Sequence, residues 1–321
     1  MVPRALPVWL PVHIAKTIGA GVPTAIGVQT DMATPALARF GSEQLKREFL
    51  APAISGDMVA SIAVTEPGAG SDVANIQTTE RKYGGDYIIN GSKGFITNGN
   101  QCDFFTLLCN TNDGDPHRNK SLIIVPANLP GIHRSTSLKK MGLLCSDTAT
   151  VFFDDVRVPQ SHLIGVEGAG FVMQMQQFQE ERLYCAAGTY PTLENIIEET
   201  IRYTQERKTF GKPIIANQVV QHHLVEMMTE IASLKALTHE ACAAYVRGED
   251  VTTLASMAKL KVGKLVRTIP SDCLQYWGGA GYIADSIVGR AYRDLRVVAI
   301  GGGADEIMCG IIAKLKGLNP S

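Results

Sequence analysis

Two kinds of cysteine pattern are missing from this sequence: the spacing of a metal site and the framework of a disulfide-linked domain. Its seven cysteines are scattered through 321 residues, and none stand in a CxxC arrangement. Zinc sites and disulfide frameworks both depend on recurring spacings. The histidines form no metal spacing either, because the adjacent His222 and His223 would point to different sides of a helix. We therefore expect no metal site, and mostly buried thiols in a reducing compartment.

An excess of charge of one sign and a long hydrophobic run are also missing. The chain has 30 Lys+Arg against 31 Asp+Glu, a net charge of -1, and no basic run of the kind that displaces counterions from nucleic acid. No apolar run reaches the roughly 20 residues that cross a bilayer. These absences argue against nucleic-acid binding and a membrane span. With 45% hydrophobic residues, the chain can bury one large or two moderate cores.

The first residues differ in composition from the rest. Residues 1–16 hold three prolines, one Arg, one Lys and no acid. A cleaved targeting peptide is normally richer in Arg and Ser. This stretch is at best a weak targeting signal.

Helical spacing of apolar residues marks both ends of the chain. From His13 to about Ser55, Ala, Leu and Ile recur at helical intervals, and Ser42 precedes Glu43 as an N-cap would. After residue 170 the helical patterns are long, with breaks near 212–213, at Gly248 and at 278–281. The first stretch predicts a pair of helices, and the second predicts a bundle of three or four.

The middle of the chain has a different texture. Between Met58 and about Val158, short β-rich runs alternate with turn residues, as in a β-barrel or sandwich. The runs are 59–64, 87–89, 94–97, 104–108, 121–125 and 150–153. We therefore predict an α+β multidomain protein, with a partial N-terminal helical domain (1–57), a central β-barrel or sandwich domain (58–165) and a C-terminal domain like a four-helix bundle (166–321).

The most informative motif follows the first of these strands. Residues 64–72 have the sequence VTEPGAGSD, which offers exposed backbone N–H groups, two glycines and two hydroxyls. Such a loop suits a phosphate or the polar edge of a cofactor. Glycine-rich loops are also ordinary turns between strands, so composition alone leaves both interpretations open.

Four more motifs follow TEPGAGSD (65–72) along the chain: FITNG at 95–99, FFDDVRVP at 152–159, ERKTFGK at 206–212 and QYWGGAGY at 275–282, the last followed by Arg293 and Asp294. In this order, the five motifs resemble those of the acyl-CoA dehydrogenases. The resemblance extends from about residue 13 to about residue 318. It implies a bound FAD between the β-domain and the C-terminal bundle, with neighbouring subunits of a tetramer completing each site.

The resemblance also implies which residues bind the cofactor. Two β segments would line the flavin ring, through Ile62, Ala63, Val64, Thr65, Gly70, Ser71, Phe95, Ile96 and Thr97. The ADP half would be held from a neighbouring subunit by Arg207, Phe210, Gln218, Gln275, Gly278 and Gly279, and Glu306 belongs to the same cofactor set. From residue type alone, Phe95 could as well be a core residue, and Arg207 could as well be a solvated charge near a helix end.

The chemistry requires a carboxylate base, which many family members carry in the loop before the last helix. Gly302 occupies that place here. Long-chain and isovaleryl members instead carry the base just before an arginine on the first bundle helix, which matches Glu181 and Arg182. A Glu beside an Arg on a helix is otherwise usually a solvated surface charge. We predict Glu181 as the base, with Arg182 and Ser71 in contact with the acyl-CoA.

The implied activity is the FAD-dependent α,β-dehydrogenation of acyl-CoA thioesters to trans-2-enoyl-CoA, in fatty-acid or branched-chain catabolism. The implied partners are an electron-transfer flavoprotein and further copies of the chain, as a dimer of dimers. The alternatives are an acyl-CoA oxidase and a silent paralogue that binds flavin or acyl-CoA, because the match begins inside the family's N-terminal helical domain and residues 1–11 could replace native sequence. The expected compartment is the mitochondrial matrix in a eukaryote or the cytoplasm in a bacterium.

Overall fold

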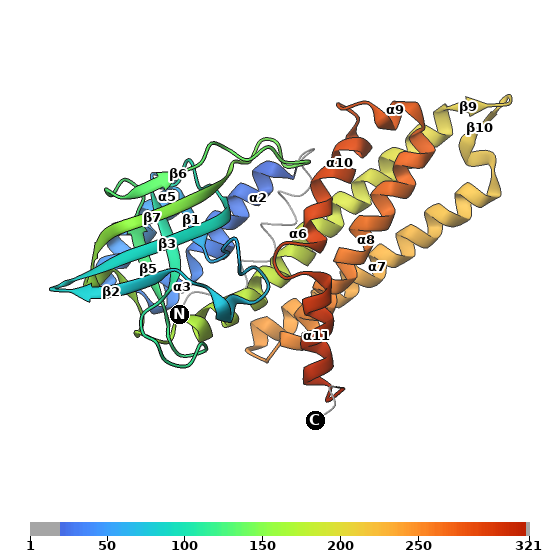
Figure 1. Ribbon diagram of the computed structural model, residues 1–321. Coiled ribbons are helices and arrows are strands. Elements are labelled where there is room, and N and C mark those ends of the chain that lie inside the picture. The colour runs from blue at the N-terminus through green and yellow to red at the C-terminus, as the bar shows by residue number, and fades with distance from the viewer. Residues whose placement is uncertain (1–19, 319–321) are drawn as a thin grey trace. The chain divides into compact units, whose positions relative to one another are not determined.

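The computed structural model describes residues 20–318, which form two compact units (Figure 1). The sheet unit comprises residues 24–140 and 144–178, and the helical unit comprises the described residues of 1–23, 141–143 and 179–321. The predicted α+β class is confirmed, because helices stand at both ends of the chain and a β-sheet lies in the middle. The boundaries expected at residues 57 and 165 stay a prediction, and residues 1–11 lie outside the described part.

Short helices open the described chain. Ser42 caps the fourth of them as predicted, because its Oγ accepts a hydrogen bond of 3.2 Å from the backbone N of Leu45. The last one ends at Gly56, whose φ of 88° is a left-handed value that glycine adopts without strain. The elements are α2 (Gly21–Gly27), η1 (Val28–Ala33), α3 (Pro35–Phe40), α4 (Glu43–Leu45), η2 (Lys46–Leu50) and α5 (Ala51–Ser55).

A single eight-stranded mixed sheet follows, with the order β6-β7-β3-β2-β4-β5-β8 and with β1 parallel to β4. Two predicted runs, 87–89 and 94–97, belong to one long strand that is interrupted by irregular register. The strands are β1 (Ala60–Ala63), β2 (Thr79–Tyr83), β3 (Asp86–Thr97), β4 (Phe104–Asn110), β5 (Lys120–Pro126), β6 (Ile132–Arg134), β7 (Thr148–Pro159) and β8 (Leu163–Ile164), and the 3-10 turns are η3 (Val73–Asn75) and η4 (Gln160–His162).

Both faces of this sheet are covered, so β4 and β5 are buried almost throughout. Phe104 and Leu108 face a core shared with the N-terminal helices. Phe105 points to the opposite core, where its ring meets that of Phe153 at 5.9 Å edge to face. Because β3 and β2 separate β7 from β4 in the sheet, this contact shows that the sheet curls over itself. The prediction left a barrel and a sandwich open, and the structure shows one curled sheet.

Long helices dominate the second unit. The breaks predicted at 212–213 and Gly248 each separate two long helices, and the break at 278–281 follows the end of α8 and coincides with the short α9. The elements are α6 (Gly170–Glu206, which begins in the sheet unit), β9 (Lys208–Thr209), β10 (Lys212–Pro213), η5 (Ile214–Ala216), α7 (Gln218–Arg247), α8 (Thr252–Trp277), α9 (Gly279–Tyr282), α10 (Ile287–Leu295), η6 (Arg296–Ala299) and α11 (Asp305–Leu315).

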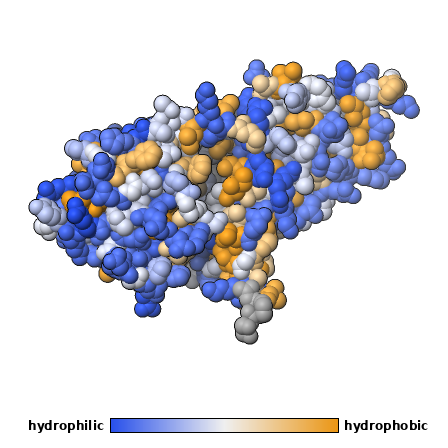
Figure 2. All heavy atoms as spheres, in the orientation of Figure 1, coloured by the Kyte–Doolittle hydropathy of each residue, from blue (hydrophilic) through white to orange (hydrophobic). Residues whose placement is uncertain are grey.

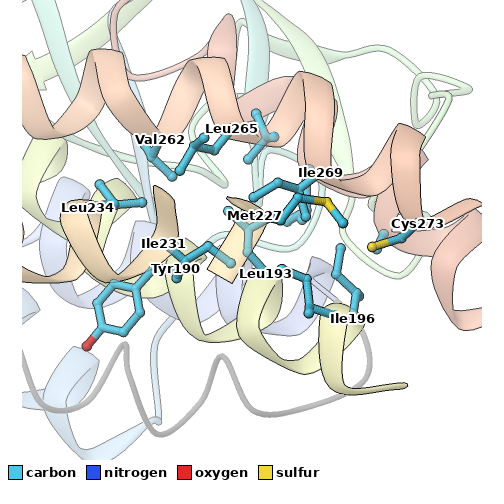
Figure 3. Packing of buried hydrophobic residues seen from close by; sticks show 14 of the residues in the cluster. Tyr190, Leu193, Ile196, Met227, Ile231, Leu234, Val262, Leu265, Ile269 and Cys273 are labelled. Carbon is cyan, nitrogen blue, oxygen red and sulfur yellow. The ribbon is translucent and has the colours of Figure 1, made fainter. Parts of the chain in front are cut away.

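The core of the helical unit comes from one stripe on each long helix (Figure 3). Residues three or four apart lie on the same face of a helix, so each stripe is continuous. Stripe members from α6, α7 and α8 point toward one another: Tyr190, Leu193, Ile196, Met227, Ile231, Leu234, Val262, Leu265, Ile269 and Cys273. This packing fixes the positions from which polar residues of the same helices project.

Among residues 20–318, no helix has both the length and the apolar character needed to cross a bilayer. The same residues contain no group of three or more side chains placed to hold a metal ion. Four of the seven cysteines are buried, Cys185 is half-buried, and Cys145 and Cys309 are exposed.

Candidate active site

The loop at 64–72 leaves β1 and turns back on itself. The backbone N of Glu66 donates to the carbonyl of Ala69 at 3.0 Å, and the N of Ala69 donates to the carbonyl of Glu66 at 3.1 Å. Gly70 and Ser71 beyond this turn are exposed, and a β-carbon at position 70 would meet no atom within 4 Å. The loop therefore presents open backbone on its outer side, as a cofactor-binding loop must.

The second predicted flavin segment, 95–97, lies beside this loop. The backbone N of Gly94 donates to the carbonyl of Thr65 at 2.8 Å. Phe95 has a φ of 58° and a side chain that is 71% exposed, an uncommon conformation and environment for a bulky aromatic residue. Strained backbone of this kind collects at functional sites. The sheet unit thus brings together the two segments that sequence placed around the flavin ring.

Not every residue of these segments can use its side chain. Ala63 and Ile96 are buried in the core of the sheet unit. Any contact that they make with a ligand must therefore come from their backbone groups. Ile62, Thr65 and Thr97 are half-buried, so their side chains reach the surface in part.

The predicted base lies in the helical unit, on a buried face of α6. The side chain of Glu181 is 5% exposed, and Arg182 beside it is also buried. Nη1 of Arg182 lies 3.5 Å from Oγ of Ser256 on α8, and its Nε has no hydrogen-bond partner among the described residues. A buried donor without a partner is costly, so Arg182 is suited to a ligand that supplies an acceptor.

The glycine loop before α11 packs against the same region. A β-carbon at Gly302 would lie 3.1 Å from Sγ of Cys185 and 3.8 Å from Cε of Lys259. Cys185 follows Glu181 by four residues on α6, which places the two on one face of the helix, one turn apart. Residue 302 and Glu181 therefore approach one region of the helical unit from two elements.

Lys259 was not identified from the sequence, although it is fully buried. Its Nζ donates to the carbonyl of Gly303 at 2.6 Å and so holds the glycine loop against α8. One turn further along α8, Gly263 leaves room for the carboxylate of Asp305, which accepts from Arg267 at 2.9 Å. The signal in the sequence that could have identified Lys259 is its position within the apolar stripe of a helix.

Electrostatics in this cluster follow from burial. Burial lowers the pKa of the Lys259 ammonium, while negative charge at Cys185 and Asp305 opposes the shift. Burial likewise lowers the pKa of the Arg182 guanidinium, while the negative charge of Glu181 acts to raise it. Burial raises the pKa of Asp305, which Lys259 and Arg267 oppose. The region holds buried charges of both signs shielded from water, and the Nε of Arg182, without a partner among the described residues, suits an acceptor such as a carbonyl oxygen.

The predicted ADP-binding residues gather at the other end of the long helices. Phe210 and Gly211 connect β9 to β10 with φ values of 50° and 80°, as a tight hairpin turn requires. The Phe210 side chain is fully exposed, at 105%. Arg207, just before the hairpin, and Gln218, at the start of α7, are exposed as well.

Ring stacking joins the last turns of α6, before this hairpin, to the end of α8. Tyr203 and Trp277 stack with ring centroids 4.3 Å apart and planes at 7°, and they lie four residues before Arg207 and two residues after Gln275 respectively. Gly278 ends α8 with φ 56° and ψ -138°, a conformation open essentially to glycine alone. Gln275, Gly278 and Gly279 are exposed there. Glu306, by contrast, is exposed on the first turn of α11, close in sequence to the glycine loop.

Profiles of known protein families match almost the whole chain. Profiles described as acyl-CoA dehydrogenase N-terminal, middle and C-terminal domain match residues 12–57, 61–156 and 168–316. The chain is 37% identical over 309 residues to the mitochondrial long-chain specific acyl-CoA dehydrogenase of Sus scrofa, covering 96% of this chain and 71% of that one. It is 34% identical over 305 residues to an acyl-CoA dehydrogenase of Bacillus subtilis, covering 95% and 80%.

Solved structures agree with these matches. The crystal structure of an acyl-CoA dehydrogenase from Geobacillus kaustophilus superposes with a TM-score of 0.94 at 38% identity, covering 97% of this chain and 82% of that one.

Proposed function

Because this chain belongs to the acyl-CoA dehydrogenase family of FAD-dependent oxidoreductases, we propose that it oxidises long-chain or branched acyl-CoA thioesters with Glu181 as its base. The product would be a trans-2-enoyl-CoA. The proposed preference for long or branched acyl chains rests on the predicted position of the base and on the likeness to the long-chain specific enzyme of Sus scrofa. The pig protein is mitochondrial and another relative is bacterial, so the compartment would follow the source: matrix in a eukaryote, cytoplasm in a bacterium.

The residues of the sheet unit fit a flavin. Open backbone over Gly70 and the exposed ring of Phe95 lie on adjacent segments. Thr65 and Thr97 can donate hydroxyl hydrogen bonds to ring heteroatoms, and Ser71 can contact the acyl-CoA. When bound there, FAD supplies the acceptor for the β-hydride.

One observation supports the assignment of the base: a β-carbon at Gly302, where no carboxylate is present, would lie against Sγ of Cys185, and Cys185 is one turn of α6 from Glu181. Glu181 would take the α proton, since a carboxylate shielded from water accepts a carbon-bound proton more readily than a hydrated one. Arg182, with its unpartnered Nε, would hold the thioester end. Lys259 holds the glycine loop against α8 through its hydrogen bond to Gly303.

The activity is tested with the purified protein and acyl-CoA under anaerobic conditions. We expect a yellow protein whose flavin absorbance bleaches on addition of substrate, without peroxide on re-aeration. Peroxide would instead indicate an oxidase, and a colourless protein would indicate a silent paralogue.

The base is tested by Glu181→Gln, which keeps the size of the side chain and removes its proton acceptance. Acyl-CoA should still bind, while flavin reduction slows by about a thousandfold. The matched control is Glu180→Gln on the same helix, where the carboxylate already accepts a hydrogen bond from Tyr245. If Glu181→Gln reduces flavin at the parent rate, Glu180 or Glu306 becomes the better candidate.

A rescue experiment sharpens this test. Adding Gly302→Glu to Glu181→Gln should restore part of the rate, because both positions address the same region. Position 302 has a φ of 63°, so any side chain there costs about 1–2 kcal/mol. Gly302→Ala in the same background carries that strain without the carboxylate, and it should restore nothing.

The proposal includes a homo-oligomer that is at least dimeric, with a dimer of dimers as the expected assembly, and an electron-transfer flavoprotein as electron acceptor. Figure 2 shows hydrophobic side chains on the surface at the end of the helical unit where α9, β9 and β10 lie. Phe210, Val219, Tyr282 and Ile283 are exposed in this unit. A patch of this kind is commonly covered by a partner, which supports the ADP half of FAD being held from a neighbouring copy.

A further inference from the structure

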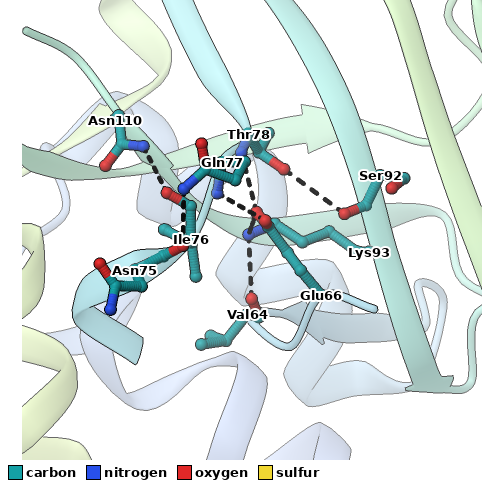
Figure 4. A network of polar contacts seen from close by, with 9 residues as sticks. All are labelled: Val64, Glu66, Asn75, Ile76, Gln77, Thr78, Ser92, Lys93 and Asn110. Atoms are coloured by element: carbon teal, nitrogen blue, oxygen red, sulfur yellow. Dashed lines mark hydrogen bonds and ion pairs between the residues drawn. The ribbon is translucent and has the colours of Figure 1, made fainter. Parts of the chain in front are cut away.

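An ion pair is buried behind the loop at 64–72. Nζ of Lys93 on β3 lies 2.9 Å from Oε1 of Glu66, and their side chains are 0% and 6% exposed (Figure 4). Lys93 stands two residues before Phe95, on the same strand. The pair therefore joins the two segments that are proposed to surround the flavin ring.

Every charge of this pair is matched by further hydrogen bonds. Glu66 accepts from the backbone N of Gln77 at 2.5 Å and from that of Thr78 at 2.9 Å. Lys93 also donates to the carbonyl of Val64 at 2.9 Å. The pair thus ties together the end of β1, the segment before β2, and β3, as Figure 4 shows.

Stabilisation of the fold alone does not explain why this ion pair is buried. Buried ion pairs are often no more stabilising than apolar side chains of the same volume, because both charges lose their hydration. Burial raises the pKa of Glu66, but Lys93 and the donors at Thr78 and Gln77 outweigh it and leave that pKa below its usual value. The carboxylate is therefore charged at neutral pH and held by directional, charge-assisted hydrogen bonds, which fix its position.

The outer side of the loop provides no comparable restraint. β-Carbons at Gly68 and Gly70 would meet no atom within 4 Å, and Ser71 is exposed. Within the loop, the backbone N–H groups of Glu66 and Ala69 each donate to the carbonyl of the other. The conformation of the loop thus depends on what holds it from inside.

We infer that Lys93 and Glu66 are positioning residues that set the flavin-facing conformation of Thr65 through Ser71 against Phe95. The inference rests on the proposed function of these segments. Neither side chain can touch a ligand itself, since both are buried behind the loop. They act by holding the backbone on both sides of Thr65, whose own carbonyl is bonded to Gly94.

The test separates position from stability by comparing a single and a double variant. Lys93→Met leaves a buried carboxylate without its cation and should lower the Tm of the apoprotein by about 10 °C. Lys93→Met with Glu66→Gln removes both charges at nearly constant volume and should recover most of that loss. The Kd for FAD of the double variant should nevertheless stay raised by about tenfold or more, with a shifted visible absorption band.

Lys120→Met is the matched control. Lys120 is a second fully buried lysine of the sheet unit, and its Nζ donates to Pro116 and Asn119 rather than to the loop. Its removal should lower the Tm but leave the Kd for FAD within about twofold of the parent value. A loss of FAD affinity as large as that of the double variant would mean that instability alone explains the effect, and would overturn the inference.

Glu66→Asp gives an independent answer if the double variant does not fold. It keeps both charges but shortens the reach of the carboxylate, so the loop should shift and FAD affinity should fall by about fivefold or more. FAD affinity and spectrum equal to the parent, in either Glu66→Asp or a stable double variant, would refute the inference while leaving the proposed activity intact. A parent protein that binds no FAD would refute both.

Discussion

Glu80 on β2 is expected to make the stability of the protein depend on pH. Its side chain is 7% exposed, and neither carboxylate oxygen has a hydrogen-bond partner among the described residues. Burial and the nearby charge of Glu167, against a smaller opposing effect of Lys82, raise the pKa of Glu80 to about 7. Glu167 accepts a hydrogen bond from Tyr87 and forms an ion pair with Lys82, so its charge is held near Glu80.

The size of the effect follows from the shift. Between the unfolded pKa of 4.5 and the folded value of about 7, the difference corresponds to about 3 kcal/mol. Because the folded pKa is the higher one, the contribution is fully present below pH 4.5 and is lost as the pH rises through 7. Glu80→Gln cannot ionise, so it should be up to about 3 kcal/mol more stable than the parent at alkaline pH and nearly equal to it in acid.

The assay is denaturant unfolding of the parent and of Glu80→Gln at about pH 5 and about pH 8, with Glu48→Gln as a control at an exposed site of the same unit. The gap between the parent and Glu80→Gln should open with rising pH, whereas Glu48→Gln should follow the parent. Parallel curves for the parent and Glu80→Gln would refute the reasoning about Glu80.

Three further changes and one measurement test the rest. Gly70→Val should abolish FAD retention, because the side chain would occupy the open outer side of the proposed flavin loop. The protein should stay folded, since a β-carbon there meets no atom within 4 Å. Gly85→Val is equally unobstructed and should retain FAD, as measured by absorbance at the flavin band. Arg207→Gln should weaken FAD binding in a titration, and a parent-like Kd would remove it from the site. Leu193→Ala should cost about 3 kcal/mol of unfolding free energy, since Leu193 is fully buried. The holoprotein should elute as a dimer or larger, and a yellow, active monomer would contradict the proposed oligomer.

Local patterns in the sequence were enough for much of the fold. Ser42 as an N-cap and Gly248 as a helix end are decided by the residue and its immediate neighbours, and both predictions are confirmed. β2 was not predicted, because four of its five residues are exposed and its polar sequence TERKY lacks the apolar alternation of a half-buried strand. Its place between β3 and β4 comes from pairing, not from its own composition.

The sequence by itself determined the family, the fold class and most of the helices and strands, because motifs and periodicities are written in consecutive residues. Through the family resemblance it also predicted Glu181 as the base in place of Gly302. Tertiary structure alone decided which polar groups are buried and what faces them. Lys93 on β3 meets Glu66 in the loop after β1, and Gly302 in the loop before α11 packs against Cys185 on α6. Burial and pairing of this kind depend on packing between segments far apart in the chain, and that packing sets the desolvation and the hydrogen bonds through which these residues act.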